Sequence, residues 1–443
     1  MAVNTPLEYR SLVIYEIYVR SHSPSGTFAG VEADLERIRS LGVDVVWFMP
    51  IHPIGKIKRK GSLGSPYSIT DYRAANPEYG TKEDFARLIE KAHGLGLKVM
   101  IDVVYNHTAH DSVLLAEHPE YYHLDAGGRP VTTVPEWSDV IDLKYPNPEL
   151  EAYLIETLQG WARFGVDGFR CDVASLVPVD FWMRAREAVA QVKPGMIWLA
   201  ESVHAGFVSF RRSAGLSGYS DGELYRAFDL TYDYDIWPVW QSALSGRVPL
   251  ERYLEMLRFQ DCIYPENFIK LRAVENHDNH RIQAVLPDRE KALAWTAFEA
   301  FNKGAFLIYA GQESGAVQTP SLFEKEPISW GDYPLQPFLT RLAAIKKHPA
   351  VTQGRFVLSQ TEPAVQAAWI HPEGSLLGIF DLSGKGRTVP VPLPDGAYAE
   401  LLNDETLHVR GGELVLPGPA AVLLFQQGVR IKELYSELLD FHL

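Results

Sequence analysis

The sequence predicts an α/β fold: a (β/α)8 TIM barrel with a short inserted domain after its third strand and a C-terminal antiparallel β-sandwich. Apolar, strand-like runs alternate with helical patterns through most of the chain. Carboxylates stand at or just beyond the ends of several of these runs, which is where a TIM barrel builds its site. After about residue 350 the pattern changes to short alternating strands.

Eight barrel strands are expected. Their runs are continuously apolar rather than alternating, as in a parallel sheet that is buried on both faces. They lie near Leu12–Tyr18, Val43–Met49, Leu97–Val104, Val166–Cys171, Ile197–Ala200, Tyr225–Leu230, Phe268–Val274 and Ala305–Tyr309. A doubly wound open sheet could show the same rhythm, so periodicity alone leaves that alternative open.

The intervening helical patterns have recognisable ends. One helix is expected before Gly42, where apolar residues recur at helical spacing: Val31, Leu35, Ile38 and Leu41. Thr81 and Asp84 resemble a capping box before a second helix. Asn147 followed by Pro148 is typical of the start of a third.

The predicted domains follow from these patterns. The barrel is expected over residues 1–107 and 146–348, interrupted by residues 108–145, which are too long and irregular for a plain loop. Residues 349–428 are expected to form the β-sandwich, and 429–443 a terminal helix. The sandwich strands are expected at Ala364–Ile370, Leu376–Asp381, Thr388–Val391, Glu413–Val415 and Ala420–Phe425.

Composition narrows the classes of function. The 443 residues carry a formal net charge of -14, which disfavours nucleic-acid and anionic-membrane partners and is compatible with a neutral substrate. Cys171 and Cys262 are the chain's two cysteines, too few for a disulfide framework or a cysteine zinc cluster. The start of the chain does not resemble a signal peptide, and no apolar run reaches the roughly 18 residues of a membrane span. A cytoplasmic location is therefore expected, whereas the oligomeric state is left open.

Three carboxylates are expected in one cleft. Asp172 closes the fourth strand, Glu201 the fifth and Asp278 the seventh, and strand ends meet at one rim of a barrel. Like charges this close raise the pKa of at least one group, which favours an ionised nucleophile and a protonated general acid. Arg170 lies on the same strand face as Asp172 and can keep that carboxylate ionised. Glu201 follows the apolar residues Trp198 and Leu199, so it is the better candidate for the protonated general acid.

Two other interpretations compete at these residues. A salt-bridged polar rim could explain any one of them, but hardly Arg170 and three acids together. A metal site could use Asp102, His107, His277 and Asp278, but the first strand lacks the His-x-His of metal-dependent barrels. The two histidines are therefore expected to donate hydrogen bonds, and the Tyr67 ring to stack on a sugar.

At these residues the chain resembles the α-amylase family of retaining glycoside hydrolases and transglycosylases. The resemblance covers nearly the whole chain, and its segments occur in the family's order: Gly42–Ile51, Asp102–His107, Gly168–Asp172, Leu199–Glu201, Val274–Asp278 and Gly304–Glu313. It implies that Asp172 is the nucleophile and Glu201 the acid/base, a pair about 5–5.5 Å apart in retaining enzymes. Asp278 would stabilise the transition state. The remaining implied site residues orient the nucleophile, bind sugar hydroxyls, stack or support the site: Arg170, His107, His277, Tyr67, Asp102 and Asn106.

The chain also departs from the family pattern. Many α-amylases carry Lys-His shortly after the nucleophile, which binds an acceptor sugar and supplies a carbonyl to calcium. Here Asp172 is followed by Val173, Ala174, Ser175 and Leu176. Asn106 is nevertheless a candidate ligand for a structural calcium ion, and the chemistry is expected to need no cofactor. The loop from His52 to Pro66 resembles one found in the family's maltosyltransferases.

The expected function is hydrolysis of α-1,4-glucosidic bonds in starch, glycogen or malto-oligosaccharides through a covalent glycosyl-enzyme. The alternative on the same fold is a 4-α-glucanotransferase or maltosyltransferase. A third hypothesis, from another class, is a non-catalytic glucan-binding barrel, although such relatives usually lose one of the acids. The expected partner is thus an α-glucan or malto-oligosaccharide, with neither nucleic acid nor membrane.

Overall fold

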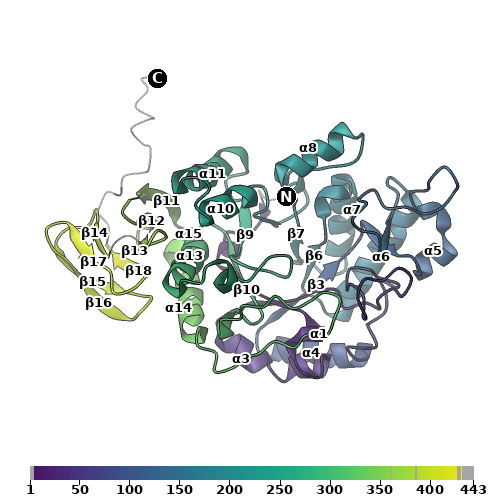
Figure 1. The fold of residues 1–443 in the computed structure, drawn as a ribbon, viewed down its shortest axis with the longest axis horizontal. Coiled ribbons are helices and arrows are strands. Elements are labelled where there is room, and N and C mark those ends of the chain that lie inside the picture. The colour runs from purple at the N-terminus through teal and green to yellow at the C-terminus, as the bar shows by residue number, and fades with distance from the viewer. Residues whose placement is uncertain (1–3, 361, 385–386, 427–430, 432–443) are drawn as a thin grey trace.

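Eight parallel strands close into a barrel at the centre of the molecule (Figure 1). The computed structural model describes residues 4–360, 362–384, 387–426 and 431. Around the barrel the strands follow the order β1-β10-β9-β8-β7-β6-β3-β2. Their bounds are β1 Val13–Ile17, β2 Val45–Phe48, β3 Lys98–Val103, β6 Gly168–Cys171, β7 Ile197–Ala200, β8 Leu230–Tyr232, β9 Ile269–Arg272 and β10 Ala305–Tyr309. The predicted (β/α)8 barrel is confirmed, and the open-sheet alternative is excluded.

Helices connect the strands and cover the outside of the barrel (Figure 1). They are α1 Val19–His22, α2 Phe28–Glu32, α3 Leu35–Ser40, α4 Lys82–Gly94, α6 Pro148–Phe164, α7 Val179–Ala190, α8 Ala205–Ser213, α9 Asp221–Leu224, α10 Trp237–Leu244, α11 Leu250–Ile263, α12 Ile282–Val285, α13 Arg289–Phe301, α14 Gln336–Lys346 and α15 Pro349–Gln353. The capping box of Thr81 and Asp84 is confirmed at α4, and Asn147 caps α6 ahead of Pro148. The helix expected through Val31–Leu41 is instead broken in two, α2 and α3.

The prediction of a strand over Tyr225–Leu230 is wrong. Ser220 and Glu223 form a capping box that starts the short helix α9, and β8 begins only at Leu230. The first residue of this apolar run packs outside the sheet: Tyr225 contacts Phe268 and donates its hydroxyl to the Ile269 carbonyl oxygen, 3.1 Å away. The apolar run therefore covers β9 instead of entering the barrel.

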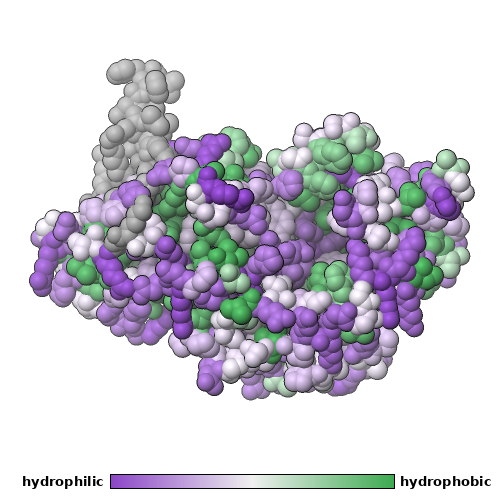
Figure 2. Space-filling view, in the orientation of Figure 1, coloured by the Kyte–Doolittle hydropathy of each residue, from purple (hydrophilic) through white to green (hydrophobic). Residues whose placement is uncertain are grey.

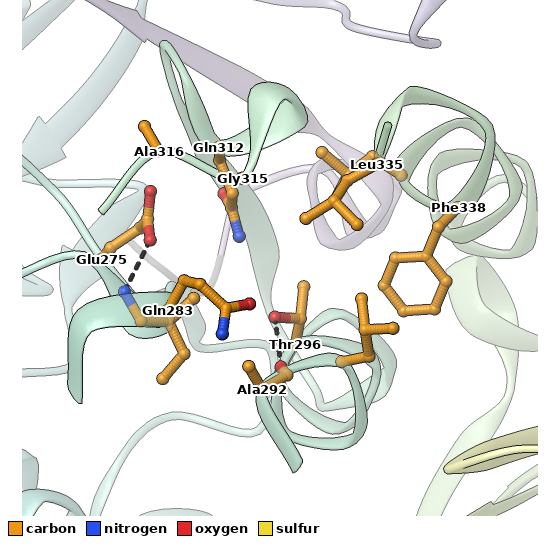
Figure 3. A pocket seen from close by; sticks show the side chains of 12 residues that line it. Glu275, Gln283, Ala292, Thr296, Gln312, Gly315, Ala316, Leu335 and Phe338 are labelled. Carbon is orange, nitrogen blue, oxygen red and sulfur yellow. Dashed lines mark hydrogen bonds between the residues drawn. The ribbon is translucent and has the colours of Figure 1, made fainter. Parts of the chain in front are cut away.

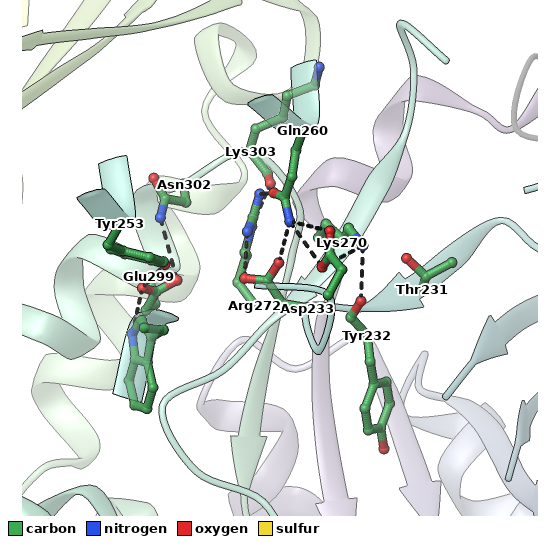
Figure 4. Close-up of polar contacts among 12 residues, drawn as sticks. Thr231, Tyr232, Asp233, Tyr253, Gln260, Lys270, Arg272, Glu299, Asn302 and Lys303 are labelled. Atoms are coloured by element: carbon green, nitrogen blue, oxygen red, sulfur yellow. Dashed lines mark hydrogen bonds and ion pairs between the residues drawn. The ribbon is translucent and has the colours of Figure 1, made fainter. Parts of the chain in front are cut away.

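A buried polar network lies outside β8 and β9 (Figure 4). Lys270 Nζ lies 3.0 Å from an Asp235 carboxylate oxygen and also pairs with Asp221. Arg272 donates to Asp233 at 2.6 Å and to Gln260 at 2.9 Å. Burying charges without partners would cost several kcal/mol. These contacts satisfy the charges and fix the loop that follows β8 at the rim of the barrel.

The barrel interior is apolar beneath the rim. Ile14, Trp47, Met100 and Leu199 belong to one buried cluster with the other inward-facing strand residues. A separate and larger cluster fills the space between the strands and the surrounding helices. The barrel interior beneath the rim residues is therefore filled by side chains, as in TIM barrels generally, and is not a pore.

A small hairpin is inserted after β3. Its strands, β4 His107–Ala109 and β5 Val140–Asp142, pair antiparallel. Helix α5 Val113–Glu117 and the 3-10 helix η3 Pro119–Tyr121 lie between them. This segment projects on the side of the barrel opposite the C-terminal sheet (Figure 1).

The C-terminal strands form an antiparallel sheet of order β11-β12-β13-β18-β15-β16 and a two-stranded ladder, β14-β17. The expected strands correspond to β12 Val365–Ile370, β13 Ser375–Phe380, β14 Thr388–Pro390, β17 Glu413–Val415 and β18 Ala420–Phe425. Three further strands were not expected: β11 Arg355–Gln360, β15 Gly396–Glu400 and β16 Glu405–Val409. The residues of β15 and β16 are mostly exposed, so their apolar alternation is weak. The helix expected over 429–443 falls, apart from Ile431, outside the described residues.

The C-terminal sheet packs on the barrel through α13. Phe380 lies 5.3 Å from Phe298 and 5.5 Å from Phe301 between ring centroids, and the indole of Trp369 donates to the Phe301 carbonyl oxygen at 2.8 Å. Among the described residues, no helix is both long and apolar enough to span a membrane. The surface in Figure 2 is mostly polar, with apolar side chains gathered over α8, where Phe210 is 62% exposed.

We expect Phe380→Ala to destabilise the protein by about 3–5 kcal/mol, because it leaves a cavity between the sheet and α13. Calorimetry should show the unfolding transition at lower temperature, with unchanged activity per folded molecule. The matched control is Val415→Ala in the same sheet domain, whose side chain is 65% exposed. Equal transitions for both variants would mean that this interface does not stabilise the fold.

Candidate active site

Arg170 lies at the centre of the site. Its side chain is fully buried on β6, and Nη1 lies 2.9 Å from Asp102 Oδ1 and 2.9 Å from Asp172 Oδ1. Nη2 lies 3.0 Å from Glu201 Oε2, an ion-pair distance without hydrogen-bond alignment. Nε donates to the Tyr232 hydroxyl at 3.1 Å. One guanidinium thus contacts three carboxylates from three strands.

The strand register produces this convergence. In the ladder, Arg170 pairs with Asp102 on β3 and with Leu199 on β7. Asp172 continues β6 and donates its amide to the Val103 carbonyl, and Glu201 continues β7 and donates to Cys171. The carboxylates of Asp102, Asp172 and Glu201 therefore lie together at the same end of neighbouring strands.

The backbone turn after Asp172 is strained, and the strained residue bonds to Glu201. Val173 has φ 34°, the left-handed region that a β-branched residue rarely adopts. This conformation directs the Val173 amide at Glu201, which accepts the bond at 2.6 Å. Strain of about 1–3 kcal/mol at one residue is retained where the surrounding structure enforces it. Sequence reasoning did not assign Val173 a place in the site.

Burial and charge set the protonation of the carboxyls. Burial raises the pKa of Asp172 to about 7 and that of Glu201 to about 7, with Arg170 acting in the opposite direction. The pKa of Asp102 rises to about 6 for the same reason. Arg170 was expected to select Asp172, but it contacts Glu201 as well. The two contacts differ in geometry, however. Arg170 forms an aligned hydrogen bond with Asp172 and only an ion pair with Glu201.

Tyr67 joins the carboxylates to a histidine. Its hydroxyl donates to Asp102 Oδ2 at 3.2 Å and lies 2.7 Å from His277 Nε2. Its ring stacks on the His277 imidazole, with centroids 5.4 Å apart. Tyr67 also lines the cavity that contains the carboxylates, so its ring is available to a ligand there.

His277 is held between two acids. Its Nδ1 pairs with Glu16 on β1, and its Nε2 lies 3.2 Å from Asp278 Oδ2. Burial alone would lower the pKa of His277, but the carboxylates of Asp278 and Glu16 outweigh it and raise the pKa to about 9. The His277 side chain is therefore a charged imidazolium near neutral pH. Asp278 is the more exposed partner, with a side chain 38% exposed to solvent.

A single cavity of about 250 Å³ brings most of the expected site residues together. Its lining includes Asp172, Glu201, Asp278, Tyr67, His107 and His277. Arg170 and Asp102 lie buried behind this lining and contact it through Asp172 and Tyr67. The His107 ring lies 5.5 Å from that of Trp137, and burial lowers the pKa of His107.

Sequence reasoning missed several residues of the site. Glu16 could have been found, because it is the one charged residue in an otherwise apolar first strand. The others come from loops and the inserted hairpin and carry no local signal: Lys60, Ser65, Trp137, Asp139, Val140, Leu322 and Phe323.

The described residues around Asn106 do not form a cluster of His, Cys, Asp or Glu placed for a metal, although Asp142 Oδ1 is buried without a hydrogen-bond partner. The Asn106 amide nitrogen lies 3.2 Å from His107 Nδ1, and the described residues contain no group of three or more His, Cys, Asp or Glu placed to hold a metal. Asp142, on the same hairpin, already accepts bonds from the Thr133 amide and hydroxyl. The Thr133 hydroxyl in turn accepts a bond from Arg211 Nη1 at 2.7 Å. A buried guanidinium thus supplies positive charge near the hairpin carboxylate.

A second pocket, next to the Asp278 loop, is too small for a substrate (Figure 3). Glu275 lines it and accepts the Ile282 amide bond, and the Gln312 amide has neither its oxygen nor its nitrogen bonded. Its volume of about 10 Å³ corresponds to roughly one water molecule. Glu275 therefore supports the loop and is separate from the catalytic cavity.

We expect Arg170→Leu to destabilise the fold by about 3–5 kcal/mol, because it leaves three buried carboxylates uncompensated. The loss should be larger at pH 8 than at pH 5, since the carboxyls, with pKa values already raised to about 6–7, carry protons at the lower pH. Thermal unfolding at both pH values measures this. Arg129→Leu, at a side chain 82% exposed, is the control. A pH-independent loss would contradict the electrostatic account.

We expect the chelator EDTA to shift the melting temperature by less than about 2 °C, which corresponds to under roughly 1 kcal/mol. In the hairpin beside Asn106, Thr133 accepts a bond from Arg211 and already binds one carboxylate oxygen of Asp142. A large decrease in melting temperature that added calcium, but not magnesium, restores would show that the protein does bind a structural ion.

Comparison with known proteins agrees with this geometry. The α-amylase catalytic-domain family matches residues 15–125 and 136–348, and the bacterial α-amylase C-terminal domain matches residues 356–423. The structure of an α-amylase from Lactobacillus plantarum superposes with a TM-score of 0.91 at 43% identity, covering 95% of this chain and 100% of that one. A noncanonic maltogenic α-amylase, AmyB from Thermotoga neapolitana, gives 0.82 at 33% identity, covering 95% and 99%.

Maltosyltransferases also match. An α-1,4-glucan:maltose-1-phosphate maltosyltransferase from Corynebacterium glutamicum is 29% identical, over 69% of this chain and 44% of its own length. The chain spans about half to two thirds of the length of the first curated relatives that it matches. The matched catalytic domain covers most of the chain, and the barrel, the rim carboxylates and the C-terminal sheet agree with it. This chain belongs to the α-amylase family of glycoside hydrolases.

Proposed function

We propose that this protein hydrolyses α-1,4-glucosidic bonds in starch, glycogen or malto-oligosaccharides with retention of the anomeric configuration. The observation that carries the proposal is the Arg170 centre, which holds Asp172 and Glu201 at the wall of one cavity. Two carboxyls with raised pKa values can share one proton near neutral pH. A retaining glycosidase needs such a pair, one ionised and one protonated.

We assign the ionised role to Asp172. Arg170 donates an aligned hydrogen bond to this carboxylate, and a charge-assisted bond of this kind favours the ionised form. Glu201 lacks an aligned bond from Arg170 and keeps the proton. In the first step Glu201 transfers this proton to the glycosidic oxygen, the bond from that oxygen to the anomeric carbon breaks, and Asp172 forms an ester with the anomeric carbon.

In the second step water replaces the departed sugar. The Glu201 carboxylate takes a proton from the water, the resulting hydroxide attacks the anomeric carbon, and the ester to Asp172 breaks. Both carboxyls return to their starting states. The sugar leaves with its original α configuration because two inversions have occurred.

The other cavity residues would position the sugar. Asp278 and the protonated His277 offer an acceptor and a donor to neighbouring hydroxyls, and His107 lies in the same lining. Tyr67 presents its ring, the usual apolar surface against a pyranose. Asp102 accepts bonds from Arg170 and Tyr67 and so acts as a positioning residue.

Transfer to a second glucan chain is the alternative. It needs the same first step, after which a sugar hydroxyl replaces water. Matches to maltosyltransferases and the similar loop from residue 52 to 66 favour it. A non-catalytic glucan-binding barrel, in contrast, would not need Asp172, Glu201 and Asp278 in one cavity, and their joint presence speaks against that hypothesis.

The test is a time course with maltoheptaose that follows chain lengths and, by NMR, the anomeric form of new ends. We expect shorter products born as the α-anomer. Asp172→Ala should lower the rate by about 10⁴-fold or more, whereas Asp180→Ala, an exposed aspartate on α7, should not. Products longer than seven sugars would establish transfer instead, and β-anomeric products or full activity of Asp172→Ala would contradict the mechanism.

A further inference from the structure

The cavity at the carboxylates is small. Its volume of about 250 Å³ is below the roughly 300–1,000 Å³ of most small-molecule sites. Beyond Tyr67 and His107, its lining comes from three separate segments: the loop 52–66 after β2, residues 137–140 of the inserted hairpin, and the loop 316–325 after β10. Contacts among these three segments decide whether a glucan chain can pass.

Lys60 joins the first segment to the second. Its ammonium lies 2.9 Å from Asp139 Oδ1 and donates to the Glu136 carbonyl oxygen at 2.8 Å. Both Lys60 and Asp139 line the cavity. The Lys60 side chain is 36% exposed, whereas that of Asp139 is buried at 7%. The Lys60–Asp139 pair matters for the shape of the cavity, because it bridges loop 52–66 and the inserted hairpin.

The same loop is also joined to the third segment. The Leu63 amide donates to the Phe323 carbonyl at 3.0 Å, and the Ser62 amide donates to Glu324 at 2.7 Å. Buried Arg20 donates to the carbonyls of Gly64 and Leu322 from below. The backbones approach so closely that a Cβ on Gly61 would meet the Phe323 Cβ at 2.5 Å. Loop 52–66 therefore contacts both neighbouring segments, and the three together form one wall of the cavity.

The position of this wall relative to Glu201 determines whether it contacts the retained or the departing part of the glucan chain. Glu201 protonates the oxygen of the departing chain, so the sugars toward the reducing end leave on its side. The Ser68 hydroxyl, next to Tyr67, donates to the Asp139 carbonyl oxygen at 2.9 Å, and the Trp137 ring lies 5.5 Å from that of His107. The wall with Lys60 is therefore joined to the Tyr67 and His107 side of the cavity, where the retained sugars would lie. An internal stretch of glucan would need to continue through the wall, whereas a chain that ends there would fit.

We propose that this wall makes the protein an exo-acting enzyme, which binds the non-reducing end of an α-1,4-glucan and retains no more than two glucosyl units. Lys60 and Asp139 are its specificity residues: the ammonium donates to, and the carboxylate accepts from, the free hydroxyls of the terminal glucose. Only a chain end has a free hydroxyl at O4. The inference rests on the proposed α-1,4 activity and adds the end of the chain at which it occurs.

The test uses two 4-nitrophenyl maltoheptaosides, one with a free non-reducing end and one whose terminal 4- and 6-hydroxyls are blocked by an ethylidene group. We expect the wild type to release glucose or maltose first from the free substrate. It should cleave the blocked substrate at least about 100-fold more slowly, since the blocked hydroxyls cannot bond to Lys60 and Asp139 and the ethylidene group would meet the wall. Similar rates on both substrates, or early products longer than maltose from the non-reducing end, would overturn the inference while the α-1,4 activity stands.

Lys60→Ala tests the assigned residue. It should raise the ratio of blocked to free cleavage at least about tenfold, because the wall opens and one charged hydrogen bond to the terminal sugar is lost. Lys56→Ala, at an exposed side chain in the same loop, should leave the ratio unchanged. An unchanged ratio in Lys60→Ala would remove Lys60 from the account. If neither substrate were cleaved by the wild type, the proposed function itself would fail, and this inference with it.

Discussion

The buried guanidinium of Arg170 is the interaction on which the site depends. Three carboxylates at neighbouring strand ends would repel one another and resist burial, and one cation in contact with all three offsets that cost. The arrangement requires β3, β6 and β7 to be adjacent and in register, which the closed barrel provides. Trp47 and Tyr232 flank the guanidinium at 5.3 Å each, so the charge is enclosed by rings as well as by acids.

The rest of the molecule positions groups around that centre. Tyr234, on the loop fixed by the Lys270 and Arg272 network, accepts bonds from Asn276 and Asn279, which flank Asp278. Glu16 fixes the opposite side of the same loop through His277. Loops that follow different barrel strands thus line one small cavity together. This division explains how a common barrel can carry a specificity of its own: the carboxylates define the chemistry, and the loops define which part of a glucan reaches them.

Much of the fold and the centre of the site could be predicted from sequence because both depend on strong local patterns. Buried parallel strands have continuous apolar runs, and a carboxylate directly after such a run, as at Asp172 and Glu201, places itself at the rim. The error over Tyr225–Leu230 arose because an apolar run can cover a strand from outside as well as form one. The cavity wall could not be predicted, because Leu63 and Phe323 meet through a loop contact between residues more than 250 positions apart. The sharing of Arg170 among three carboxylates likewise depends on side-chain distances that sequence spacing does not fix.

The account's central claim is that Asp172, aligned by Arg170, forms a covalent bond to the sugar while Glu201 holds the proton. The most direct measurement is the mass of the Glu201→Gln protein after reaction with α-maltosyl fluoride, whose leaving group needs no acid. Without a base for the second step the ester should accumulate. The account predicts that the protein gains the mass of one maltosyl unit and that the peptide containing Asp172 carries it. Full turnover of the fluoride with no adduct, or an adduct on another peptide, would contradict it.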